Sequence, residues 1–141
     1  SIYLLQRRKT PVTMLEVFDA PQLNPNCLKR PHSGVSSQAL QMMNSDTVRE
    51  NSRYMAGRVI DAVGADIEKQ IERVFLTALC RWPSVQEVGM AKSTLKDLTS
   101  HWREHLDQVV PAEPKEYKAQ WLALATFCHT MLNSAEFLYI D

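Results

Sequence analysis

SVQEVGMAKSTLKDLTSHWREHL, residues 84–106, is the stretch that decides the fold class of this chain. Its apolar residues recur at three- and four-residue spacing, which is the period of one face of an α-helix. They are Val88, Ala91, Leu95, Leu98, Trp102 and Leu106. Ser84 and Glu87 form a capping box, in which each side chain can accept a hydrogen bond from the other residue's backbone N–H. We therefore predict a long helix that begins after Ser84.

Helical periodicity continues on both sides of this stretch. The expected ranges of the other helices are residues 37–44, 46–63, 66–82 and 115–133. The third of these ends at Trp82-Pro83, because the residue before a proline avoids the α region. Beyond the first few residues, no run alternates convincingly at the period of two that a strand requires. The sequence therefore predicts an all-α helical bundle of about five helices.

The first 36 residues lack this periodicity. Prolines recur there at positions 11, 21, 25 and 31, and each one fixes φ and removes a backbone donor. We expect an extended, proline-rich N-terminal loop packed on the bundle, with residues 1–36 irregular and residues 37–141 helical. The two parts together are expected to form a single domain, since 141 residues suit one hydrophobic core.

The composition argues against several classes of protein. Lysine plus arginine equals aspartate plus glutamate, 16 against 16, so no basic surface for nucleic acid is expected. No apolar run approaches the roughly 20 residues of a membrane-spanning helix. The sequence begins at Ser1 in the middle of an apolar pattern, and we interpret it as a fragment of a larger protein.

The motif HWREH, residues 101–105, is the sharpest candidate for metal chemistry. His101 and His105 are four residues apart, so both side chains can lie on one side of a helix and share a zinc ion. Glu104 could then polarise a zinc-bound water. Nothing in the sequence marks a third ligand, and both histidines can equally be ordinary residues at the edge of the apolar face. We therefore expect neither a metal nor another cofactor in this chain.

The N-terminal loop holds three candidate binding residues, Asp19, Cys27 and Arg30. Binding residues favour loops that a rigid scaffold positions. Basic neighbours of Cys27 could also activate its thiolate. The structural alternative is that Asp19 pairs with Arg30 while Cys27 packs inward.

The C-terminal segment LNSAEFLYID, residues 132–141, supplies the last candidate binding residue, Glu136. Arg30 and Arg81 are candidate ion-pair partners for the carboxylates of Asp19 and Glu136. Phe18 and Phe137 each lie next to one of these carboxylates and belong to no helical stripe. We predict that the N-terminal loop docks near this segment, that burial of the two phenylalanines anchors the contact and that ion pairs fix its register.

Five short segments of the chain have an unusual composition. They are Leu15-Glu16-Val17-Phe18-Asp19-Ala20-Pro21, residues 24–30 with Asn24, Cys27 and Arg30, Gln38-Ala39-Leu40 with Asn44, Arg81-Trp82-Pro83 with Glu87, and residues 132–139. In these segments the chain resembles the C-terminal part of a planctomycete-specific domain family of unknown function. That family occurs at the C-terminus of large proteins that also carry cytochrome c-like domains.

The resemblance implies an exported, extracytoplasmic parent protein, with haem possible in upstream domains and none in this fragment. It implies no reaction, so two functions stay open. The first is a non-catalytic helical module that contacts upstream domains of its own chain or another protein. The second is part of an enzyme that acts on polysaccharide or in electron transfer, with catalytic residues mostly upstream.

Overall fold

The computed structural model describes residue 17 and residues 35–109 and 115–138, and within these ranges it contains six helices and no strand. The chain divides into two compact units, residues 1–45 and 46–141. The first unit contributes α2 (Val35–Asn44), where the side-chain amide of Gln38 donates to the carbonyl of Val17 at 3.3 Å. The expected N-terminal loop lies almost wholly outside the described residues, so the loop and the single domain stay predictions.

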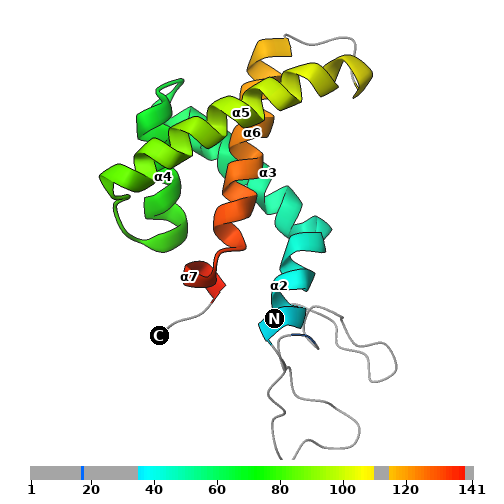
Figure 1. Ribbon diagram of the computed structural model, residues 1–141, viewed down its shortest axis with the longest axis vertical. Helices are drawn as coiled ribbons and strands as arrows, with labels where there is room; N and C mark the ends of the chain where they lie inside the picture. The colour runs from blue at the N-terminus through cyan, green and yellow to red at the C-terminus, as the bar shows by residue number, and fades with distance from the viewer. Residues whose placement is uncertain (1–16, 18–34, 110–114, 139–141) are drawn as a thin grey trace, which may run out of the picture. The chain divides into compact units, whose positions relative to one another are not determined.

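The second unit is a helical bundle. Its helices are α3 (Asp46–Val63), α4 (Ile67–Leu79), α5 (Val85–Val109), α6 (Lys115–Leu132) and α7 (Ala135–Leu138). In Figure 1, α6 runs through the middle of this unit between α3 and α5, and it packs against both. Helix α4 contacts α3, α5 and α6, whereas the short α7 contacts α4 and α6. The all-α bundle predicted from the sequence is confirmed.

Most helix ends follow the predicted signals, with two corrections. Asp66 caps α4, because its carboxylate accepts hydrogen bonds from two backbone N–H groups of the first turn. Helix α4 ends at Leu79 instead of Trp82, since Cys80 adopts the left-handed conformation, with φ of 54°, and stops the helix earlier. Helix α7 was not expected from the sequence, because four residues are too few to show a period.

The core of the second unit consists of apolar side chains from α3, α4, α5 and α6. Its buried residues are Ala56, Val59, Ile71, Val74, Phe75, Ala91, Leu95, Leu124, Ala125, Phe127, Cys128 and Met131. Trp102 joins α5 to α6, because its Nε1 donates to Thr126 Oγ1 at 3.1 Å. This core holds the α4–α5 connection near α7. A cluster of charged side chains forms where these two parts of the chain meet.

Candidate functional site

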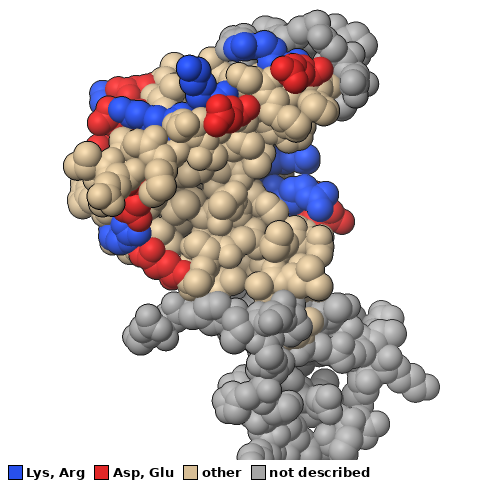
Figure 2. All heavy atoms as spheres, viewed as in Figure 1, with Lys and Arg blue, Asp and Glu red and all other residues tan. Residues whose placement is uncertain are grey.

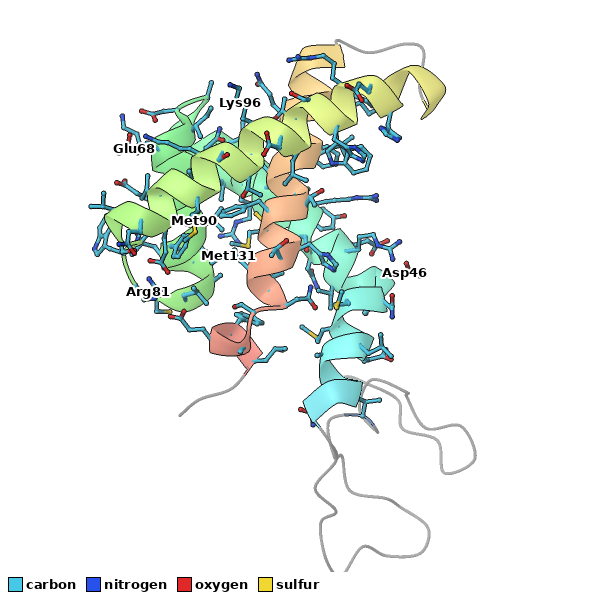
Figure 3. All side chains as sticks on the ribbon, viewed as in Figure 1. Asp46, Glu68, Arg81, Met90, Lys96 and Met131 are labelled. Carbon is cyan, nitrogen blue, oxygen red and sulfur yellow. The ribbon has the colours of Figure 1, made fainter. Side chains whose placement is uncertain are left out.

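Arg81 is the centre of a group of charged side chains in the second unit. It lies in the connection between α4 and α5, directly after the left-handed Cys80. Figure 3 shows Arg81 at the end of the bundle where α7 lies. Glu87 comes from the first turn of α5 and Glu136 from the first turn of α7. The fold therefore brings together an arginine and a glutamate that are 55 positions apart in the sequence.

Arg81 donates hydrogen bonds to both carboxylates. Its Nη1 and Nη2 donate to Glu87 Oε2 and Oε1 at 3.0 and 2.6 Å. Its Nε and Nη2 donate to Glu136 Oε1 and Oε2 at 2.5 and 2.9 Å. Both pairs are bidentate, which is the geometry that a planar guanidinium favours. The guanidinium also lies over the ring of Phe75, 5.2 Å from its centroid, as a cation–π contact.

Glu87 is held in place by a second set of hydrogen bonds. Its Oε2 accepts from the backbone N–H of Ser84 at 2.7 Å, and Ser84 Oγ accepts from the backbone N–H of Glu87 at 3.3 Å. This reciprocal pair is the predicted capping box, which is confirmed. The same carboxylate thus begins α5 and binds Arg81.

Glu136 is positioned by the turn between α6 and α7. The side chain of Asn133 donates to the carbonyl of His129 at 2.6 Å, at the end of α6. Ser134 Oγ accepts from the backbone N–H of Phe137 at 3.3 Å, as a capping side chain does at a helix start. These local bonds explain the Asn-Ser pair of the C-terminal segment: the asparagine closes one helix and the serine opens the next.

The network shifts the pKa values of its members. Hydrogen bonds from Arg81, followed by the backbone bond from Ser84, lower the pKa of Glu87 to about 2. Hydrogen bonds from Arg81 also lower the pKa of Glu136. The bonds to Glu136 and then to Glu87 raise the pKa of Arg81. Both carboxylates are therefore held ionised as acceptors, which suits a structural ion-pair network and does not suit a general acid at neutral pH.

This network predicts acid sensitivity. The pKa of Glu87 is lowered in the folded chain from 4.5 to about 2, so its stabilising effect is complete above the unfolded value and is lost as the pH falls through the folded value. We expect the free energy of unfolding, measured by urea titration, to decrease as the pH is lowered across this interval.

An Arg81→Gln variant distinguishes the acid sensitivity that this network causes from the acid sensitivity that other carboxylates of the chain cause. It should be less stable at neutral pH, and its stability should decrease less across the same interval. Arg53→Gln is the control, because Arg53 is exposed on α3 and forms no ion pair within the described residues. An Arg81→Gln variant with the pH profile of the unaltered chain would contradict the assignment.

The structure accounts for one of the four predicted binding residues. Glu136 pairs with Arg81, which was one hypothesis from the sequence. Asp19, Cys27 and Arg30 lie outside the described residues, so their roles and the docking of the N-terminal loop stay predictions. Phe137 is 40% exposed on α7, and its burial by the N-terminal loop stays a prediction.

The second role of Glu87 was not predicted from the sequence. This glutamate was expected only as a capping residue, although one of the five segments contains both Arg81 and Glu87, six positions apart. The periodicity of apolar residues predicts helix faces and cannot predict this contact. The Arg81–Glu87 pair forms because the chain turns at Cys80, which brings the start of α5 next to Arg81.

The histidine pair of the HWREH motif is exposed on α5 together with Glu104. The ring centroids of His101 and His105 are 4.2 Å apart, and His105 Nδ1 lies 2.9 Å from the carbonyl oxygen of His101. In the part of the chain that the structure describes, no group of three or more potential metal ligands occurs. The absence of a cofactor stays a prediction.

We expect the chain, purified without chelator, to contain no stoichiometric zinc, because two histidines without a third protein ligand form a weak site. Elemental analysis measures this directly. About one zinc per chain, lost in a His101→Ala variant, would contradict this expectation and support the hypothesis that the HWREH motif binds zinc.

Comparison with known proteins identifies a family. A family model described as "PSD1: Protein of unknown function (DUF1553)" matches residues 1–95, which include four of the five segments quoted above. The segment 132–139 lies beyond the match. No curated protein and no solved structure matches the chain. None of the described helices is long and apolar enough to cross a membrane. Since the matched residues make up more than half of its length, the chain belongs to the PSD1 family of proteins of unknown function (DUF1553).

Proposed function

We propose that this chain is a non-catalytic helical interaction and structural module of a larger exported multidomain protein. It packs onto an upstream domain of that protein or onto another protein. The contact surface is the apolar patch, which we define as Trp82, Val85 and Met90. The resemblance described in the sequence analysis supports the larger exported parent.

The exposure of the apolar patch is the observation that carries this proposal. Trp82 is 65% exposed, Val85 is 91% exposed and Met90 is 64% exposed. All three lie on the α4–α5 connection or the first turns of α5, and Figure 3 places Met90 at the same end of the bundle as Arg81. Large apolar side chains that are exposed close together in the sequence are candidates for a site that another protein covers.

The surroundings of the patch favour a binding surface over a reaction centre. Arg81, Glu87 and Glu136 satisfy one another, which leaves a rigid support beneath the connection that carries Trp82. Figure 2 shows that uncharged residues cover much of the viewed face of the second unit.

Binding between this chain and the rest of its parent protein, produced separately, tests the proposal. We expect isothermal titration calorimetry to show an interaction that Trp82→Ser weakens at least about tenfold, because exposed tryptophans are frequent hot spots of interfaces. The matched control is Tyr54→Ser, which removes an aromatic residue that is 73% exposed on α3. An interaction that is equally weakened by both variants would contradict the assignment of the apolar patch, and no interaction would contradict packing onto an upstream domain.

The enzymatic alternative has its own test. If the chain forms part of an active site, Asp19→Asn or Arg30→Gln should abolish an activity of the complete protein while circular dichroism shows unchanged folding. The module proposal expects that activity to persist in both variants.

A further inference from the structure

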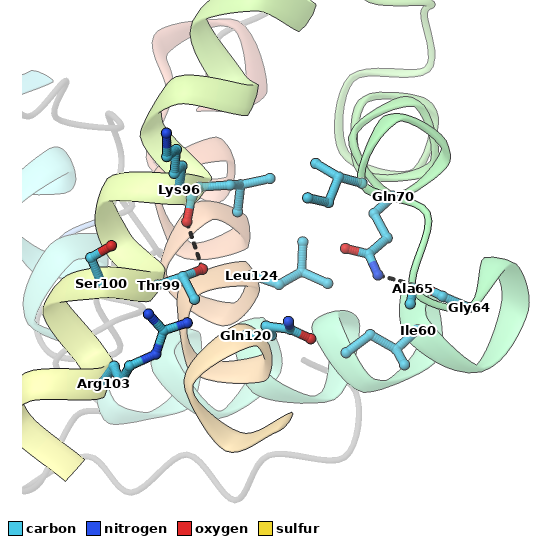
Figure 4. A pocket seen from close by; sticks show the side chains of 12 residues that line it. Ile60, Gly64, Ala65, Gln70, Lys96, Thr99, Ser100, Arg103, Gln120 and Leu124 are labelled. Atoms are coloured by element: carbon cyan, nitrogen blue, oxygen red, sulfur yellow. Dashed lines mark hydrogen bonds between the residues drawn. The ribbon is translucent and has the colours of Figure 1, made fainter. Parts of the chain in front are cut away.

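A cavity of about 450 Å³ opens in the second unit between α5, α6 and the turn that joins α3 to α4. Figure 4 shows it from close by. This volume falls within the range of pockets that bind small molecules. The cavity lies apart from the Arg81 network and the apolar patch, since none of their residues line it.

The inner surface of the cavity is apolar. Ile60, Ile67, Leu95 and Leu124 line it, and Leu95 and Leu124 belong to the buried core. Two of the polar side chains that line the cavity form hydrogen bonds within the protein. Gln70 Nε2 donates one hydrogen bond to the carbonyl of Gly64 at 2.6 Å, and Thr99 Oγ1 donates to the carbonyl of Leu95 at 2.7 Å. The four aliphatic side chains therefore offer a ligand an apolar surface.

Among the described residues that line the cavity, both charged side chains are cations. Lys96 and Arg103 line it, and neither aspartate nor glutamate is among the described residues that do. Both cations come from α5 and stand on the same side of the cavity (Figure 4). Lys96 is exposed, so it can move to meet a ligand at little cost. A cationic rim beside an apolar interior is complementary to an anion with an apolar body.

We propose that this cavity binds a small amphipathic anion, an unbranched hydrocarbon chain that ends in one carboxylate. The chain would lie against Ile60, Ile67 and Leu124, and the carboxylate would face Lys96 at the rim. The site is independent of the proposed packing function, because none of the residues that line the cavity belongs to the apolar patch.

Three probes with the same ten-carbon chain and different head groups test this assignment: decanoate, decanol and decyltrimethylammonium. Isothermal titration calorimetry with the full chain should give the order of affinity decanoate, then decanol, then the cation. A partly exposed ion pair should favour decanoate over decanol by about two- to fivefold. Equal binding of all three probes, or no binding of decanoate, would overturn the proposal.

Two variants locate the site. Lys96→Gln should reduce the affinity for decanoate to that for decanol and leave decanol binding unchanged. Thr99→Phe places a large side chain in the cavity and should abolish the binding of both probes. Arg53→Gln, which removes a positive charge from α3 outside the cavity lining, should leave both affinities unchanged. Circular dichroism checks that each variant is folded. Decanoate binding that persists in a folded Thr99→Phe variant would overturn the assignment.

Discussion

Replacing Phe75 with alanine should lower the free energy of unfolding by about 3–5 kcal/mol, the usual cost of truncating a buried phenylalanine. Phe75 is only 5% exposed and belongs to the core cluster of the bundle. Its ring also lies under the guanidinium of Arg81. The variant therefore opens a cavity in the core and removes the aromatic ring that forms the cation–π contact with Arg81.

Urea unfolding followed by circular dichroism measures this loss. The control is Tyr54→Ala, which truncates an aromatic side chain that is largely exposed on α3 and should change the free energy by less than about 0.5 kcal/mol. A Phe75→Ala variant within that same limit would show that Phe75 is not part of the core.

The second large effect concerns the thiol of Cys128. Burial raises the pKa of this thiol to about 12, from 9.0 for an ordinary cysteine. At a given pH below both values, its thiolate population is then roughly a thousandfold lower, since each pKa unit is a factor of ten. Only the thiolate reacts with a disulfide reagent. We therefore expect Cys128 to be inert in the folded chain and to react at an ordinary rate after unfolding.

A variant with Cys27 and Cys80 replaced by serine leaves Cys128 as the only thiol of the chain. Its reaction with Ellman's reagent should be slower by at least about a thousandfold in native buffer than in denaturant. A second variant that retains only Cys80, which is exposed at the end of α4, should react readily in both conditions. Rapid native labelling of Cys128 would mean that this part of α6 opens frequently.

Arg81 gives a structural reason for two of the segments in which the chain shows its family resemblance. The Arg-x-Pro-x-x-x-Glu segment reverses the chain after α4 and places Glu87 within reach of the guanidinium. The C-terminal segment ends α6, starts α7 and delivers Glu136 to the same group. Both segments therefore have a structural role, because they join α4, α5 and α7 through Arg81.

The sequence by itself determined the four long helices of the second unit, α3 to α6, and the apolar face of α5. Residues 46–63 form α3 as expected, and the capping box at Ser84 begins α5. Such features are predictable because a helix face and a cap depend on residues three or four positions apart. The partner of Glu136 was foreseen only as one candidate, and Asp19, Cys27 and Arg30 lie outside the described residues.

Only the tertiary structure decided the rest. It set the left-handed turn at Cys80, the double pairing of Arg81, the exposure of Phe137 and the cavity beside Lys96. Each of these depends on where separate helices meet, and Arg81 and Glu136 are 55 positions apart. A local pattern fixes the direction in which a side chain leaves its own helix, whereas a contact between distant residues is set by the packing of the whole core.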